Sequence, residues 1–258
     1  MVNGADSLCR GEVMVNEAGG AELALKQRQF NAAMELYSTR SGYRIFGRMV
    51  SAANVTLQLY LLFLVAPVSI GAAWQVAAFC AAFVLADFVN GVIHMIMDHE
   101  DRYQSAAGPL VAAFHLHHKT PMYKANPLHV VYFNETGAKV WLVPYLTLTV
   151  LAIHLLAPHP VLSHLLVYFG ILSSVAEVSH YLCHTSTSKT ALFLGEIGLL
   201  LPKRHHARHH AADNNNYAFL NGCSDPLINL IARRFCTGYK KNTDLHYARY
   251  QGEGSANR

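Results

Sequence analysis

The chain alternates between long apolar stretches and short polar segments that are rich in histidine. Four apolar stretches approach the roughly 20 residues that an α-helix needs to cross a bilayer. Short turns join the first stretch to the second and the third to the fourth, so the pattern predicts two helical hairpins. The four stretches cover about residues 53–70, 73–96, 138–156 and 161–182.

The remaining segments divide the chain further. Residues 1–20 are rich in Gly and Ala and are expected to be disordered, whereas residues 21–50 follow a basic helical pattern that predicts an interfacial helix. The apolar run at 191–202 is too short to cross and is expected to lie in the membrane interface. We therefore expect a disordered segment and interfacial helix over 1–50, a four-span domain with histidine boxes over 51–236, and a polar C-terminal tail over 237–258.

The basic residues predict an orientation. All 20 Lys and Arg residues precede the first stretch, lie between the second and third, or follow the fourth. By the positive-inside rule, both termini and the middle loop are predicted to be cytoplasmic, in a bacterial inner membrane or the endoplasmic reticulum. Only 14% of residues are charged, against about 25% in soluble domains. The predicted fold is all-α: an integral membrane four-helix bundle with a cytoplasmic histidine-rich helical cap.

Histidine is the residue type that carries the candidate chemistry. Twelve of the 16 histidines fall in four groups near the predicted cytoplasmic face. His206, His209 and His210 follow the spacing i, i+3, i+4, so their imidazoles leave one face of a helix together. Neutral imidazole is a common ligand of transition metals. The grouping therefore predicts metal binding. The net charge of +4 is modest and does not by itself argue for binding to nucleic acid.

Carboxylates accompany the histidines on two apolar helices. Asp87, His94 and Asp98 share one stripe of the second stretch. An unpaired carboxylate within an apolar span is costly, so Asp87 is expected to orient a ligating imidazole by accepting its second N–H. In the fourth stretch Glu177 shares a face with two candidate ligands and is expected to act in the same way.

The number of candidate ligands bears on the metal. About nine or ten are available, which suits two ions, and all-imidazole ligation with open positions is compatible with iron that activates O₂. We therefore favour a non-haem di-iron centre. A metal transporter should place ligands near mid-membrane, and a haem-binding subunit leaves the H-x-x-H-H pattern unexplained, yet both stay open as alternatives.

Five segments together resemble a known family. They are D-F-V-N-G-V-I-H-M-I-M-D at 87–98, F-H-L-H-H-K-T-P at 114–121, H-V-V-Y-F-N-E-T-G at 129–137, H-Y-L-C-H at 180–184 and L-P-K-R-H-H-A-R-H-H at 201–210. This combination resembles the Kua-type membrane lipid desaturases. The family includes plasmanylethanolamine desaturase, the CarF proteins and the plant enzyme that makes trans-3-hexadecenoyl phosphatidylglycerol. The resemblance covers about residues 86–229.

The resemblance implies a ligand set when it is carried over position by position. Whether His99, His115 or His205 replaces one of its members stays open, because each lies close to a candidate ligand in the sequence. The implied iron ligands are His94, Asp98, His117, His118, His129, His180, His184, His206, His209 and His210.

The resemblance also implies an activity. Two iron ions and O₂ would introduce a double bond near the glycerol end of a membrane phospholipid, with conversion of a plasmanyl to a plasmenyl (vinyl-ether) lipid as the first expectation. Acyl-lipid desaturation and hydroxylation of the same di-iron type stay open. The chain has no flavin or nicotinamide fingerprint, so a separate cytochrome b5-like or ferredoxin-like donor is expected. Lys203, Arg204 and Arg208 are predicted to contact that donor or an anionic headgroup.

Overall fold

Within the part of the chain that the structure describes, every regular element is an α-helix, which confirms the predicted all-α class. The computed structural model describes residues 5–119, 128, 131–132, 139–248 and 250. In chain order the helices are α1 (Ala5–Thr39), α2 (Ser41–Val65), α3 (Ala72–His99), α4 (Gly108–Lys119), α6 (Leu142–Leu156), α7 (Pro160–Thr185), α8 (Lys189–Glu196), α9 (Lys203–Ala211), α10 (Asp225–Phe235) and α11 (Thr243–Ala248).

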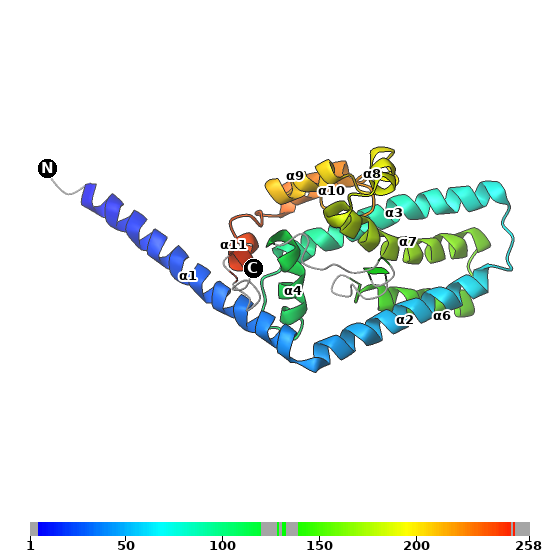
Figure 1. The fold of residues 1–258 in the computed structure, drawn as a ribbon, viewed down its shortest axis with the longest axis horizontal. Coiled ribbons are helices and arrows are strands. Elements are labelled where there is room, and N and C mark those ends of the chain that lie inside the picture. Colours follow the sequence, from blue (N-terminus) through cyan, green and yellow to red (C-terminus); the bar gives the residue numbers. More distant parts are fainter. Residues whose placement is uncertain (1–4, 120–127, 129–130, 133–138, 249, 251–258) are drawn as a thin grey trace.

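Four apolar helices, α2, α3, α6 and α7, form the body of the molecule (Figure 1). The most extensive contact joins α3 to α7, and α2 packs on both α6 and α7. Helices α2, α3 and α7 are long and apolar enough to cross a membrane, whereas α6 has 15 residues, fewer than the roughly 20 that a span needs. The protein is a helical membrane protein. The fourth span and the cytoplasmic orientation stay predictions.

A sharp bend separates α1 from α2 (Figure 1). We expected one helix over residues 21–50, but α1 ends at Thr39 and α2 begins at Ser41 because Arg40 takes extended backbone angles (φ −79°, ψ 115°). Helix α1 also reaches back to Ala5, through the segment for which we expected disorder. The bend directs α1 away from the bundle and onto α4 and α11.

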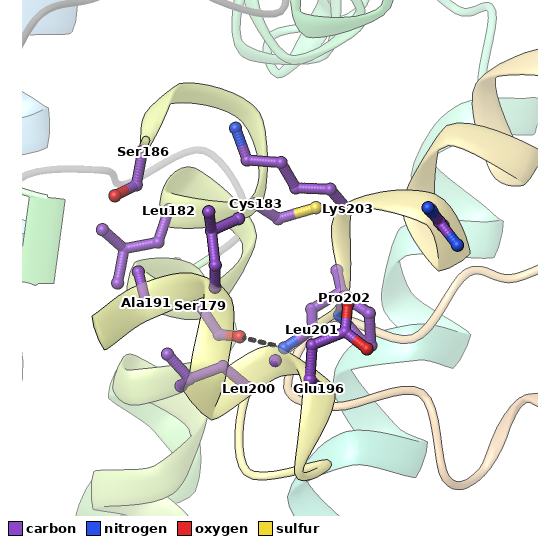
Figure 2. A pocket seen from close by; sticks show the side chains of 13 residues that line it. Ser179, Leu182, Cys183, Ser186, Ala191, Glu196, Leu200, Leu201, Pro202 and Lys203 are labelled. Carbon is purple, nitrogen blue, oxygen red and sulfur yellow. Dashed lines mark hydrogen bonds between the residues drawn. The ribbon is translucent and has the colours of Figure 1, made fainter. Parts of the chain in front are cut away.

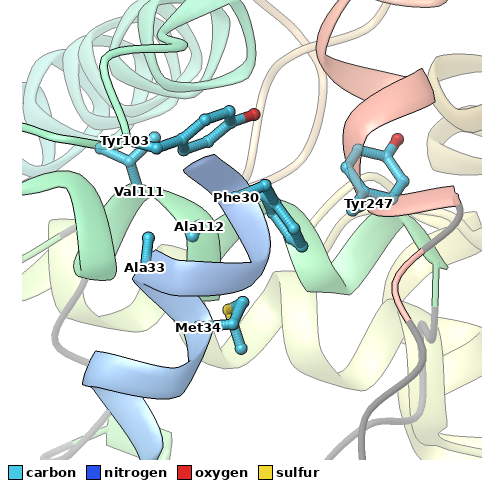
Figure 3. Close-up of a cluster of buried hydrophobic side chains, with 7 residues drawn as sticks. All are labelled: Phe30, Ala33, Met34, Tyr103, Val111, Ala112 and Tyr247. Atoms are coloured by element: carbon cyan, nitrogen blue, oxygen red, sulfur yellow. The ribbon is translucent and has the colours of Figure 1, made fainter. Parts of the chain in front are cut away.

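A cluster of apolar side chains holds α1 in that position (Figure 3). Phe30 on α1 is fully buried, and its ring centroid lies 5.3 Å from Tyr103 and 6.4 Å from Tyr247 of α11. Val111 and Ala112 of α4 complete the contact. Burying one such aromatic side chain stabilises the fold by about 1.5–3 kcal/mol. The cluster therefore holds α1 and α11 against α4.

One close approach sets the distance between α3 and the segment around α10. A Cβ atom at Gly91 would lie 2.5 Å from Ile228 Cδ1 and 3.0 Å from Ala218 Cα. A larger residue at position 91 would therefore force Ile228 to move and crowd the backbone at Ala218, so glycine suits this close packing of α10 on α3. Beyond α10, the segment that we expected to be a polar tail includes the buried residues Tyr239, Thr243, His246 and Tyr247.

Candidate metal centre

Four helices bring nine of the ten predicted metal ligands to one place. The tenth, His129, lies outside the described residues. On each helix the spacing of i, i+1, i+3 or i+4 directs the donors to one side. The nine come from α3 (His94, Asp98), α4 (His117, His118), α7 (His180, His184) and α9 (His206, His209, His210).

The first set of donors, the Asp98 group, consists of His94, Asp98, His117, His118 and His209. Asp98 Oδ2 lies 3.3 Å from the Nε2 atoms of His94 and His209, and Oδ1 lies 3.2 Å from His118 Nε2. Four of the five side chains are buried, so the donors face one another rather than solvent.

The second set, the α9 group, consists of His117, His184, His206 and His210, with His180 beside them. The Nε2 atoms of His180, His184 and His206 form a triangle in which each side is 3.0 Å. His117 belongs to both groups. Two ions held by these groups would therefore be neighbours.

The 3.0 Å triangle has the dimensions of one face of an octahedron. Two nitrogens bound to one ion at about 2.1 Å lie about 3.0 Å apart at right angles and about 3.4 Å apart at the tetrahedral angle. His180, His184 and His206 are thus close enough together to bind one ion.

Hydrogen bonds fix the tautomer of four ligands. In each, Nδ1–H donates to an oxygen that carries no proton, so Nε2 keeps a free lone pair directed into the centre. The acceptors are the Tyr217 carbonyl for His94 (2.8 Å), the Phe114 carbonyl for His117 (2.6 Å), the Asn215 carbonyl for His209 (3.0 Å) and the Asp244 carboxylate for His118 (3.2 Å).

Burial keeps the ligands of α4 and α9 neutral. It lowers the pKa of His117, His118 and His206 well below the ordinary value, and neighbouring imidazoles lower it further. The same causes lower the pKa of His210 to about 2. Neutral imidazole is the form that binds a metal, so these side chains are ready ligands at physiological pH.

Several buried polar atoms at the centre have no hydrogen-bond partner. They include His94 Nε2, His117 Nε2 and both carboxylate oxygens of Asp98. Buried polar atoms nearly always have a partner, and an unpaired carboxylate within a span is costly. Metal cations would satisfy all of these atoms at once, so the residues present fit a metal centre.

Asp87 does not contact a histidine within the described residues, contrary to our interpretation of the α3 stripe. Its Oδ1 accepts the N–H groups of Leu220, Asn221 and Gly222 at 3.0, 2.9 and 3.1 Å. Its Oδ2 accepts the N–H and the hydroxyl of Ser224 at 2.9 and 2.7 Å. The carboxylate is fully buried, and these donors supply the partners that its burial requires.

The loop that Asp87 binds also places the ring of Phe219 against two of the candidate ligands. The ring of Phe219, next to Leu220, stacks on His180 at 4.1 Å and lies 4.3 Å from His94. Phe114 lies 4.8 Å from His117. These apolar rings keep water away from the imidazoles, so Asp87 acts on the centre through the loop.

The three basic residues predicted as contacts lie at the outer side of α9. Arg204 and Arg208 are exposed, whereas His206 and His209 on the same helix are buried. Lys203 and Arg204 line a pocket of about 220 Å³ between α7, α8 and the start of α9. Figure 2 shows Lys203 at this pocket together with Leu182, Cys183 and Leu200.

The other predicted residues differ in their partners. Glu177 is buried on α7 one turn before His180, and its role stays a prediction. His115 contacts the Tyr103 hydroxyl and the Met97 carbonyl, which occupies both ring nitrogens. His205 Nε2 lies 2.5 Å from Asp225 Oδ2, and His99 Nδ1–H donates to the Met95 carbonyl. None of these three histidines belongs to the Asp98 group or the α9 group.

Sequence reasoning missed Asp244. This residue of α11 accepts from His118 through Oδ1 and from Lys240 Nζ through Oδ2 at 2.7 Å. A ligating histidine commonly donates to a carboxylate in this way. No local pattern reveals the contact, because Asp244 and His118 are 126 positions apart. The separation of four positions between Lys240 and Asp244 was the sole local signal.

Comparison with known proteins assigns the family. The lipid desaturase domain matches residues 83–233, more than half of the chain. The chain belongs to the lipid desaturase family. This match confirms the family resemblance inferred from the histidine segments, and every donor of the Asp98 group and the α9 group lies within the matched residues.

Two plant relatives each match 55% of the lipid desaturase chain. Fatty acid desaturase 4, chloroplastic, from Arabidopsis thaliana is 32% identical over 152 residues, which are 55% of this chain and 44% of the relative. Fatty acid desaturase 4-like 2, chloroplastic, from the same plant is 31% identical over 156 residues, which are 55% of this chain and 50% of the relative. The match thus spans about half the length of these relatives. No solved structure matches the chain.

Proposed function

We propose that the protein is a membrane-bound non-haem di-iron lipid desaturase that uses O₂ to introduce a double bond near the glycerol end of a phospholipid chain. One observation carries the proposal: two adjacent groups of buried or half-buried donors share His117, and the donor atoms of His94, His117 and Asp98 have no hydrogen-bond partner. Membership of the lipid desaturase family supports the same reaction class.

The donor set favours two iron ions. Imidazole donors with a single carboxylate suit iron that keeps positions open for O₂. The two groups and His180 together offer nine donors, which are more than one ion binds, and this number supports two ions.

Each residue of the centre then has a defined task. Nine donors hold the metal, the Nδ1 acceptors orient the rings, and Phe219 and Phe114 exclude water. Bound iron would supply the redox chemistry, in which O₂, two external electrons and two protons from solvent remove two hydrogens from adjacent carbons and yield two waters. No side-chain acid or base is needed beyond the ligands.

The pocket beside α7 supports a phospholipid substrate. Lys203 and Arg204 offer two cations to a phosphate, while Leu182 and Leu200 offer an apolar wall. Ser179 and Cys183 of the same wall are sequence neighbours of the ligands His180 and His184 on α7. We propose that a headgroup at Lys203 brings carbons near the glycerol within reach of the centre.

Two substrates are candidates. The first is a plasmanyl lipid, which would make the protein a plasmanylethanolamine desaturase-like enzyme of plasmalogen metabolism. The second is an acyl phospholipid, which the names of the two relatives favour. Mass spectrometry of lipids from cells with and without the gene distinguishes them, because a vinyl-ether product marks the first and an unsaturated ester the second. A product heavier by one oxygen would point to a hydroxylase instead.

The exposed side of α9 supports an external electron donor. Arg204 and Arg208 lie one helical turn apart on the same face, and this basic surface suits an acidic cytochrome b5-like or ferredoxin-like protein. Exposed charges raise the rate of encounter more than the final affinity. We therefore expect Arg204→Ala to slow reduction by the donor while the metal content stays unchanged.

Metal analysis of the purified protein tests the central proposal. We expect close to two irons per chain in the parent and a clear loss in His206→Ala and His210→Ala. His154→Ala is the matched control, since this exposed histidine of α6 contacts Tyr60 and no ligand. One zinc per chain, or iron content that is equal in all variants, contradicts a di-iron centre at these residues.

A further inference from the structure

A second cavity, which we call the elbow cavity, lies at the bend between α1 and α2, away from the metal centre. It measures about 760 Å³ and is bounded by the end of α1, the first turns of α2, the start of α4 and Val140. Pockets that hold small molecules measure about 300–1,000 Å³. Helix α4 begins beside the cavity at Gly108 and reaches His117 nine residues later, about 13 Å along its axis, so the two sites are distinct.

The walls of the elbow cavity are held in place by the apolar cluster of Figure 3. Ala33 and Met34 of α1 pack with Val111 of α4, and the cavity starts five residues after Met34, at Thr39, and directly before Val111, at Leu110. Because this packing fixes α1 against α4, the space between their ends is part of the fold and does not depend on a bound ligand.

One side of the elbow cavity attracts anions. Arg40 lines it, and no carboxylate within the described residues pairs with this guanidinium. The first turn of α2 lies on the same side, with no side-chain cap and no acidic residue. The uncapped N–H groups of a helix start carry partial positive charge. No lining residue is acidic, so the charge of this side is not neutralised.

The other side of the elbow cavity is apolar. Phe46, Leu110 and Val140 form it. On α2 the neighbouring side chains Ile45 and Met49 are 55% and 65% exposed, and α2 is one of the helices apolar enough to cross a membrane. A water-soluble phosphate would leave these apolar side chains in water. An amphiphile with a phosphate and a hydrocarbon chain covers both sides.

We propose that the elbow cavity binds a membrane phospholipid. Its phosphate lies at Arg40 and the start of α2, and the upper part of one hydrocarbon chain lies against Phe46, Leu110 and Val140. The lipid fills the bend between α1 and α2 and joins the first helix to the membrane-embedded bundle. This lipid is not the substrate, since the cavity is separated from the ligands by the length of α4.

Lipid retention by the purified full chain tests the proposal. Protein in detergent is titrated with phosphatidylglycerol, and bound lipid is counted by native mass spectrometry alongside thermal unfolding. Loss of one charge-assisted contact corresponds to about tenfold in affinity. We therefore expect Arg40→Ala to weaken retention about tenfold or more, Arg40→Lys to restore part of it, and Leu110→Trp to abolish it by filling the apolar side.

Matched variants and a second ligand make the result decisive. Arg28→Ala removes an exposed arginine of α1 outside the cavity, and Leu148→Trp enlarges an exposed leucine of α6; both should retain lipid like the parent. Metal content should be equal in all variants. Equal retention in the cavity variants and their controls overturns the proposal, and so does inorganic phosphate that raises the unfolding temperature as much as the phospholipid does.

Discussion

Asp87 offers the sharpest test of how the metal centre is held together. Its buried carboxylate accepts five hydrogen bonds from N–H and O–H groups of the loop that follows Phe219, and a weaker one from the Cys223 thiol. We predict that Asp87→Asn strongly destabilises this loop. The amide has the size of the carboxylate, so the change tests hydrogen bonding and charge rather than packing. In Asp87→Asn, the N–H groups of Leu220, Asn221 and Gly222 still donate to an oxygen, which is now that of a neutral amide. The N–H of Ser224 faces the NH₂ group and loses its acceptor.

The magnitude follows from these contacts. A hydrogen bond to a charged acceptor contributes about 1.5–3 kcal/mol, roughly twice a neutral one. Asp87→Asn loses one such bond and weakens three others, for a total of about 4–6 kcal/mol. Asp87→Ala loses all five and reaches the whole net stability of a typical domain, about 5–15 kcal/mol. The alanine variant is therefore expected not to accumulate as folded protein. The asparagine variant is the one whose unfolding can be measured.

Thermal unfolding of the purified protein, followed together with metal content, is the assay. A shift of roughly 2–4 °C per kcal/mol predicts a midpoint lower by about 8–24 °C. Glu22→Gln makes the same chemical change at an exposed position of α1 and should leave the midpoint unchanged. Folded Asp87→Asn should keep its metal, because Asp87 touches no ligand within the described residues. A midpoint within the error of the parent refutes the reasoning, and normal stability with lost metal would mean that Asp87 acts directly on a ligand.

Three further predictions address the contacts around the centre. Asp244→Asn should weaken iron retention about 10–100-fold in chelator competition. Lys240→Met should weaken it less, because Lys240 donates to Asp244 and to the His210 carbonyl but makes no hydrogen bond to an imidazole. Equal retention in parent and Asp244→Asn contradicts this role. Gly91→Ala should lower the free energy of unfolding by about 1–3 kcal/mol. Adding Ile228→Val should recover part of this loss, since Ile228 Cδ1 is the atom that a Cβ would approach to 2.5 Å. A double variant no more stable than Gly91→Ala argues against this clash. Burial lowers the pKa of His117, His118, His206 and His210 below the ordinary value of about 6.5, so protons bind the unfolded chain first as pH falls. The free energy of unfolding should therefore drop below about pH 6.5 by about 1.4 kcal/mol per pH unit for each such imidazole, and a flat unfolding temperature between pH 7 and pH 5 contradicts it.

The sequence predicted what depends on local spacing. Three apolar stretches became α2, α3 and α7 with boundaries shifted by several residues, because hydropathy over a span is a local property. His206, His209 and His210 lie on one short helix, as the i, i+3, i+4 spacing requires. Their partners on α3, α4 and α7 could be placed near them only by assuming that the helix ends meet at one side.

The sequence could not predict what depends on distant backbone. The stripe of Asp87 and His94 indicated a carboxylate that serves a histidine, yet the donors to Asp87 are main-chain N–H groups more than 130 positions away. Main-chain donors leave no trace in the side-chain pattern. The bend at Arg40 was missed because the Ser41-Gly42 pair that follows it is only a weak signal of a helix break, whereas the packing of Phe30, which fixes the direction of α1, involves distant residues.

The candidate ligands and some of the residues that hold them in place lie in different parts of the chain. All nine described ligands lie within residues 83–233, the part that matches the lipid desaturase domain. Asp244, which orients His118, and Phe30, which holds α1 on α4 and α11, lie outside it. A chain cut to the matched residues would keep every ligand but lose the carboxylate that fixes one ring and the cluster that anchors α4. Such a truncated protein should bind iron more weakly than Asp244→Asn does, because it loses the packing of α4 as well as the hydrogen bond. Equal iron retention by the truncated and full chains would show that the matched region builds the centre alone.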